Sequence, residues 1–166
     1  MRNLITNLSG ALIMAVAATS ASAQAFEKYG EVEGWKVFVD AEKQSCLIEK
    51  IDDFENVVQM GLTADKTAAY VGVFTKGETK IKKGEKEAVA ILVGENLYFG
   101  EATGMRGNIT KGYSGGYVLS DDPQFIDDVA KQYTMTVFPE KEFAFVVDLT
   151  GTLKAIDMVK KCQSER

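Results

Sequence analysis

The 166-residue chain contains no histidine, only two prolines and only two cysteines. The absence of histidine excludes Ser-His-Asp and Cys-His catalysis, histidine metal ligands and histidine pH switches. Basic residues are also few: 19 stand against 24 acidic residues, for a formal net charge of −5. Because nucleic-acid binders usually carry a basic excess, this composition argues against a nucleic-acid partner.

Apolar side chains, in contrast, are plentiful. Hydrophobic residues make up 46% of the chain and aromatic residues 10%. That supply is enough for one domain with a real core, and it argues against global disorder. We find no internal repeat, low-complexity tract or linker, so a single domain is expected.

The first 23 residues have the features of a secretory signal peptide. Arg2 provides a positive start, residues 12–18 are apolar, and Ala21-Ser22-Ala23 is a small-x-small cleavage signature before Gln24. A cut two residues later also fits, and a buried N-terminal helix is the alternative interpretation. The apolar stretch is shorter than the ~20 residues that span a membrane. We therefore expect a β-rich domain at 24–166, periplasmic or secreted, with no membrane span in its mature form.

Both cysteines, Cys46 and Cys162, lie in the predicted mature domain. An even number of cysteines in an exported chain favours a disulfide, and two buried free thiols are the alternative. Closing a loop of this length would constrain the unfolded chain by about 4–5 kcal/mol in the entropy model. The two cysteines lack the Cys-x-x-Cys spacing that would indicate a redox-active pair.

Apolar runs and turn residues predict a mainly β fold. About eight short strands are expected, drawn from segments 35–39, 46–48, 57–60, 68–74, 88–93, 97–99, 105–110, 117–119, 134–138 and 143–147. Segments 68–74 and 88–93 are continuously apolar, as in strands buried on both faces. The charged, glycine-punctuated stretch 76–87 is expected to be an exposed turn or hairpin.

Two helices interrupt the strands. The first is expected to be capped by Ser120, Asp121 or Asp122, with Pro123 at an early helical position. Its predicted inner face consists of Phe125, Ile126, Val129, Ala130 and Tyr133. The final helix should be capped by Thr150 or Thr152, and its spacing turns these residues inward: Leu153, Ala155, Ile156, Met158, Val159 and Cys162. The predicted fold is a β-sandwich or distorted barrel with both helices packed on it.

Possible catalytic groups are limited to carboxylate pairs at residues 52–53, 121–122 and 127–128. Adjacent residues point apart, whereas acid–base catalysis needs carboxyl groups that converge on a substrate. A helix cap explains the second pair, and Asp127 with Lys131 forms an i,i+4 pair on a solvated face. No calcium-loop spacing is present. The sequence therefore predicts no catalytic residue, metal site or cofactor.

The segment Lys111-Gly-Tyr-Ser-Gly-Gly-Tyr117 is the best candidate for binding. Glycines beside tyrosines can form an adaptable binding loop, for which the candidate contacts are Lys111, Tyr113, Ser114 and Tyr117. A tight turn with two packed rings is the alternative interpretation of the same residues.

The two ends of the mature chain resemble the invasion-associated locus B family of exported α-proteobacterial proteins. The similarity is carried by Gly34-Trp35-Lys36-Val37, by Cys46-Leu47-Ile48 and by the segment from Val147 to Ile156. A helix followed by a strand, from Asp122 to Phe138, fits the same order. Phe38 and Val39 replace an early cysteine of the family, so its cysteine pairing is not transferred. The resemblance implies a β-rich, periplasmic or secreted protein without established catalysis, linked in some members to host-cell entry.

These observations favour an exported, non-enzymatic domain that binds a protein or an envelope component. A small-ligand carrier that uses the interior or mouth of the barrel is the first alternative. A hydrolase built on Asp, Glu, Lys or Ser without histidine is the second.

Overall fold

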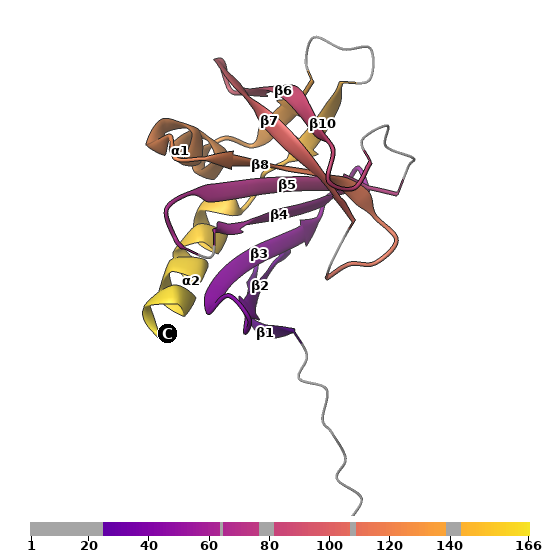
Figure 1. Ribbon diagram of the computed structural model, residues 1–166. Coiled ribbons are helices and arrows are strands. Elements are labelled where there is room, and N and C mark those ends of the chain that lie inside the picture. Colours follow the sequence, from indigo (N-terminus) through magenta and orange to yellow (C-terminus); the bar gives the residue numbers. More distant parts are fainter. Residues whose placement is uncertain (1–24, 64, 77–81, 107–108, 139–143) are drawn as a thin grey trace, which may run out of the picture.

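The computed structural model describes residues 25–63, 65–76, 82–106, 109–138 and 144–166. They form one antiparallel sheet of ten strands and two helices (Figure 1). In chain order the elements are β1 Phe26–Val32, β2 Trp35–Asp40, β3 Ser45–Ile51, β4 Val57–Leu62, β5 Ala69–Thr75, β6 Lys86–Val93, β7 Asn96–Arg106, β8 Ser114–Ser120, α1 Pro123–Lys131, β9 Thr134–Val137, β10 Phe145–Asp148 and α2 Thr152–Ser164.

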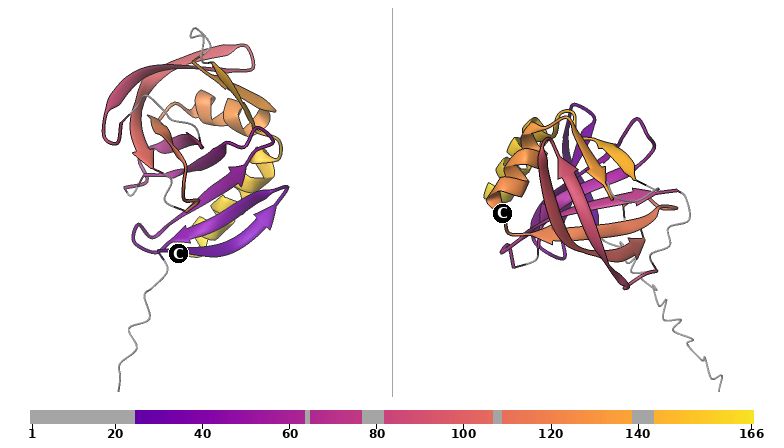
Figure 2. Two further views of the ribbon diagram at one scale, coloured as in Figure 1. Left: turned by 90° about the vertical axis from the view of Figure 1, so that its right-hand side faces the viewer. Right: turned by 90° about the horizontal axis from the view of Figure 1, so that it is seen from above.

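The strands lie in the order β1-β2-β3-β4-β5-β8-β7-β6-β9-β10, and every recorded pairing between neighbours is antiparallel. The sheet curls strongly, and α1 and α2 lie together on one side of it (Figure 2). The predicted class, a mainly β sandwich or distorted barrel carrying two helices, is confirmed. The predicted signal peptide and parts of the segments 76–87, 105–110 and 143–147 lie outside the described residues.

The main core lies on the inner face of the sheet, which we define as the face that carries the side chains packed with α1 and α2. Trp35 and Val37 of β2, Ile48 of β3 and Val93 of β6 are at most 1% exposed. They alternate with residues of the opposite, outer face, as the two-residue period of a strand requires. Trp35 is therefore a core residue, and its indole Nε1 donates a hydrogen bond to the carbonyl oxygen of Thr150 at 2.9 Å.

Helix α1 begins as the sequence predicts. Asp122 is its N-cap, and the carboxylate accepts a hydrogen bond from the backbone N–H of Gln124 at 2.8 Å. Phe125 and Val129 are buried against the sheet. The expectation that Tyr133 lies on the buried face is wrong: it follows the helix and its exposed fraction is 72%.

Helix α2 begins differently from the prediction. Its N-cap is Gly151, at φ 84°, and no side chain caps the helix. Thr152 is instead the first helical residue, and its buried hydroxyl donates to the carbonyl oxygen of Leu149 at 2.5 Å. Ala155 and Cys162 are fully buried, as expected, but Leu153 is 50% exposed and does not belong to the buried stripe. The first turn therefore follows the positive-φ turn at Gly151 and not a threonine cap.

Strand β1 has no counterpart among the predicted strands. Its sequence FEKYGEV mixes charged and apolar residues, and none of its side chains is fully buried. The strand pairs along its length with β2, with a register shift between Lys28 and Gly30. Because it is an edge strand that shares only part of the core, its sequence lacks the alternation that marks the other strands.

Candidate functional site

The candidate binding segment 111–117 enters β8 and is held by a small second core. Tyr113 is only 6% exposed and packs with Val57 and Phe74. The ammonium group of Lys76 lies 5.7 Å from the centre of the Tyr113 ring, which is cation–π geometry. Tyr113 therefore anchors the segment to the sheet, while Lys111 is exposed and Ser114 is partly buried.

The paired glycines of this segment are required by the sheet. A Cβ atom added at Gly115 would lie 2.0 Å from the carbonyl oxygen of Val73, and one at Gly116 would lie 3.0 Å from that of Thr103. Since backbone atoms cannot move as a flexible side chain can, glycine is needed here for close approach of strands. The glycines thus let β8 fit between β5 and β7.

A polar contact holds the chain just before this segment. The hydroxyl of Thr110 donates a hydrogen bond to Glu49 Oε1 at 2.6 Å, and the amide of Gln59 donates to Glu49 Oε2. Glu49 and Gln59 are each 4% exposed. Burial, together with the negative charges of Asp40 and Glu49, raises the pKa of the nearby Tyr70 above its ordinary value. Tyr70 therefore keeps its phenolic proton at neutral pH.

Exposed apolar side chains lie on the outer face of β7 and β8. The strand registers place Leu119 beside Tyr70, and Tyr117 beside Thr103. Four residues of this face form what we call the outer patch: the exposed Leu97, Phe99 and Leu119, and the partly buried Tyr117. Phe99 is 79% exposed, Leu97 49% and Leu119 50%. The ring of Tyr117 is partly buried and meets that of Tyr70 edge-on, with centroids 6.4 Å apart.

One ion pair lies within the same face. Lys86 of β6 and Glu101 of β7 are 2.6 Å apart, and both side chains are more than half exposed. The hydrogen bond and charge of Glu101 raise the pKa of Lys86. Glu101 lies two residues after Phe99 in β7, so both side chains are on the same face. Thr103 of β7 is paired with Lys86 of β6 on one side and with Tyr117 of β8 on the other. The ion pair therefore lies beside the outer patch.

The carboxylate pairs have structural partners. Asp52 is 4% exposed and accepts hydrogen bonds from the backbone N–H groups of Phe54 and Asn56, whereas Asp53 is exposed. Asp122 caps α1, and Asp127 pairs with Lys131 on the helix surface. Among the residues that the structure describes, no group of three His, Cys, Asp or Glu side chains could hold a metal ion.

Asp128 has a partner that the sequence pattern did not reveal. Its Oδ2 accepts hydrogen bonds from the Tyr98 hydroxyl at 2.6 Å and from the Asn96 amide at 2.7 Å. These two bonds lower the pKa of Asp128. The ring of Tyr98 also packs against that of Phe125, with centroids 4.9 Å apart. Together these contacts dock α1 on the β6–β7 hairpin.

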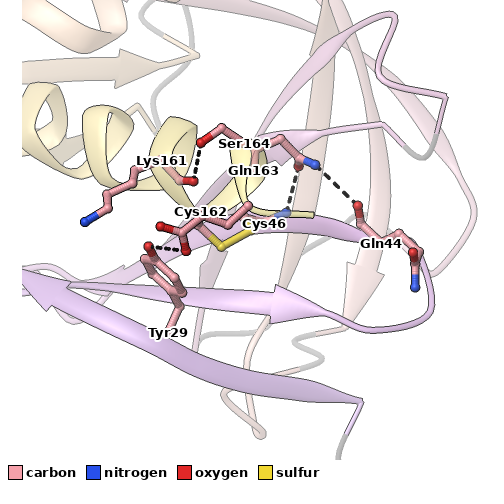
Figure 3. Close-up of a disulfide and its surroundings, with 8 residues drawn as sticks. Tyr29, Gln44, Cys46, Lys161, Cys162, Gln163 and Ser164 are labelled. Atoms are coloured by element: carbon pink, nitrogen blue, oxygen red, sulfur yellow. Dashed lines mark hydrogen bonds between the residues drawn. A yellow bond between two sulfur atoms is a disulfide. The ribbon is translucent and has the colours of Figure 1, made fainter.

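A disulfide joins Cys46 to Cys162, with Cα atoms 6.2 Å apart, and links β3 to the end of α2 (Figure 3). Gln163 reinforces the link: its Oε1 accepts from the backbone N–H of Cys46 at 3.1 Å, and its Nε2 donates to the carbonyl oxygen of Gln44 at 3.4 Å. The disulfide expected from the sequence is therefore present in the structure, and Cys162 points inward as its helical spacing predicts.

Comparison with solved structures finds matches to this fold. The crystal structure of invasion associated protein B from Bartonella henselae aligns with 85% of this chain and 99% of its own, with a TM-score of 0.55 and 14% identity. The fold resembles that of invasion associated protein B. The resemblance inferred from the two ends of the sequence is thus confirmed at the level of the fold. No family model and no curated protein matches the chain.

The site residues of the sequence analysis are therefore distributed over two environments of the invasion associated protein B fold. Tyr113 belongs to a small core, whereas Tyr117 lies on the outer face beside Leu119. Phe99 and Leu97 were expected only as part of a hairpin strand. Their exposure could not be inferred without the register, because a short apolar strand does not reveal which face is covered. In the described part of the chain, no helix is long and apolar enough to cross a membrane.

Proposed function

We propose that the protein is exported and acts by binding another protein through the outer patch, without catalysis. The observation that carries this proposal is the exposure of Phe99, 79%, in the middle of a regular strand. An aromatic side chain held out by a rigid sheet loses little conformational entropy on binding and typically anchors an interface. Leu97 and Leu119 extend the apolar area around it.

The ion pair on the outer face favours a protein over a lipid surface as the partner. Burying Lys86 and Glu101 in hydrocarbon would remove their hydration and give no polar partner in return. A folded protein can accept Phe99 in an apolar pocket and still offer hydrogen bonds to the ion pair. Both side chains are more than half exposed and so can meet such groups.

The candidate segment 111–117 contributes to this surface in two ways. Tyr117 is part of the outer patch, and Lys111 is an exposed charge at the beginning of the segment. Tyr113 supports them from the small core and is too buried to contact a partner directly. The proposed roles are therefore contact for Tyr117 and Lys111, and anchoring for Tyr113. Ser114 alternates with Tyr117 along β8 and belongs to the opposite face.

Site-specific photocrosslinking in the host cell tests this binding function. A photoreactive phenylalanine analogue is placed at Phe99 and, as a matched control, at Phe54, which is 60% exposed in the turn between β3 and β4. We expect crosslinks to one defined protein from position 99 and none of that product from position 54. Equal products from both positions would contradict the proposal, as would crosslinks to lipid alone.

The partner identified in this way is then purified, and its affinity is measured for the wild type, Phe99→Ser and Phe54→Ser. Loss of a central anchor should weaken binding by about 30-fold or more. The Phe54→Ser variant should bind as the wild type does. Unchanged affinity of Phe99→Ser, with circular dichroism showing an intact fold, would exclude the outer patch as the interface.

Export is tested separately by the intact mass of the protein isolated from its host. We expect a chain that begins at Gln24 and is two hydrogens lighter than its dithiol form. Support for export comes from the disulfide and from the signal-peptide pattern. An uncleaved chain with two free thiols would contradict this part of the proposal.

A further inference from the structure

The two halves of α2 are attached to the sheet by different kinds of contact. At its beginning, Thr152 and Ala155 are at most 1% exposed, and Trp35 holds the carbonyl oxygen of the preceding Thr150. These contacts lie directly after β10, and both Val147 of β10 and Leu149, the residue that follows it, are also buried. The first half of α2 is therefore fixed by burial and by its short connection to the sheet.

The second half depends on partners more than a hundred residues away in sequence. Apart from the disulfide, its hydrogen bonds to the sheet are those of Gln163 and the bond from the Tyr29 hydroxyl to Glu165 at 2.9 Å. Those bonds are exposed or only partly buried, and exposed polar contacts contribute little to stability. Met158 and Val159 are only partly buried against the core. The disulfide is thus the principal constraint on this half.

The same end of α2 also supports β1. Met158 lies over Gly30, where an added Cβ atom would come within 2.9 Å of the Met158 sulfur, and Tyr29 carries the bond to Glu165. Strand β1 otherwise pairs only with β2, along one edge. Release of the end of α2 would therefore uncover the inner side of β1.

We propose that the Cys46–Cys162 disulfide is a redox latch: its reduction releases α2 from Met158 onward together with β1, while β4 to β9 stay folded. Reduction breaks one S–S bond and adds two electrons and two protons, which a dithiol supplies as it becomes a disulfide. Closure returns them to a disulfide oxidant. The latch needs neither the outer patch nor its partner: Cys46 lies in β3, which β4 and β5 separate from β8, and Cys162 lies in α2.

Hydrogen–deuterium exchange on the full mature chain tests the latch. Peptides from β1 and from 158–166 are compared with peptides from β7 and β8, in the oxidised protein and after reduction with dithiothreitol. We expect exchange to accelerate by about tenfold or more in the first group and by less than about twofold in the second. Equal acceleration in all peptides, or none in either group, would overturn the proposal.

Two further measurements keep the test decisive if the reduced protein aggregates. The variant Cys46→Ser/Cys162→Ser should reproduce the local pattern without a reductant. In the oxidised protein, Cys46 is 2% exposed and Cys162 fully buried, so a reductant needs an opening to reach them. The second measurement is the rate of reduction at low urea concentrations. If the disulfide is reached by a local opening, this rate should change little with urea; a rate that rises with urea as global unfolding does would refute the latch.

Discussion

The carboxylate of Asp52 accepts a hydrogen bond from the backbone N–H of Asp148, at 3.3 Å, and thereby connects the end of β3 to the last strand of the sheet. The same turn supplies Asn56, whose amide Nδ2 reaches the carbonyl oxygen of Val146 at 3.5 Å. Side chains of the β3–β4 turn thus bind the N–H group of Asp148 and the carbonyl oxygen of Val146 in β10.

Replacement of Asp52 should be strongly destabilising. The substitution Asp52→Ala removes the acceptor for Phe54, Asn56 and Asp148 N–H groups, and we expect a loss of about 3 kcal/mol in the free energy of unfolding. The neighbouring Asp53→Ala, at an exposed position, should change it by less than about 0.5 kcal/mol. Urea denaturation of both variants measures the difference. Similar values for the two would show that Asp52 does not organise this junction.

The Lys50–Asp148 pair predicts an acid-dependent loss of stability. Their charged atoms are 2.5 Å apart; burial opposes ionisation of Asp148, but the hydrogen bonds from Lys50 and Thr150 outweigh it and lower its pKa from 3.8. The folded state therefore binds its proton less readily than the unfolded state. The stabilisation of the folded state by ionised Asp148 is therefore present above pH 3.8, and it is lost as the pH falls through the lower pKa of Asp148 in the folded state.

Denaturation curves between pH 6 and pH 2.5 test this dependence in the wild type and in Lys50→Met. The variant should be less stable near neutral pH and should lose less stability on acidification, because Asp148 has lost its cation. Parallel curves for the two proteins would assign the acid sensitivity to other carboxylates.

Tyr98 predicts the opposite behaviour at alkaline pH. Burial and its hydrogen bond to Asp128 raise the pKa of Tyr98 to about 12 from 10.0. The folded state thus holds the phenolic proton more tightly than the unfolded state. The contribution of protonated Tyr98 to the stability of the fold is therefore complete below pH 10 and declines as the pH rises toward 12. Tyr98→Phe should lack this decline in thermal unfolding measured from pH 8 to 11.5. An unchanged slope would place the alkaline transition at another tyrosine.

Gly115 should not tolerate a side chain. Because an added Cβ atom would lie 2.0 Å from the Val73 carbonyl oxygen, Gly115→Ala should cost about 3 kcal/mol by forcing β8 away from β5. Gly84→Ala is the matched control: φ is +84° there, but no atom lies within 4 Å, so about 1 kcal/mol of backbone strain is expected. Thermal unfolding ranks the two variants, and a reversed order would contradict the close strand approach.

Much of the fold follows from local sequence signals. Helical spacing placed Cys162 inward, and Asp122 before Pro123 predicted the start of α1. These features depend on neighbours within one or two turns, which the sequence displays directly. The predicted strand segments 88–93 and 97–99 likewise fall in β6 and β7, and the structure pairs Val93 with Asn96 at the turn between them.

The remaining features depend on contacts between distant segments. Tyr113 reads as a loop residue until Val57 and Phe74 are placed against it, and Tyr133 reads as a core residue until the helix ends before it. The exposure of Phe99 depends on which face of β7 the helices cover. None of these follows from local periodicity. Strand order and register decide the environments of Tyr113 and Phe99, and the end of α1 at Lys131 decides that of Tyr133.

The side chains that bind the backbone of β10 also limit the addition of a further strand to this edge of the sheet. A strand from a neighbouring molecule would have to displace Asp52 and Asn56 before it could reach the backbone of β10. At the opposite edge, β1 presents Glu27, Lys28 and Glu31, whose charges must be desolvated by any incoming strand. Both borders of the sheet are thus defended against edge-to-edge aggregation, one by satisfied hydrogen bonds and the other by charge.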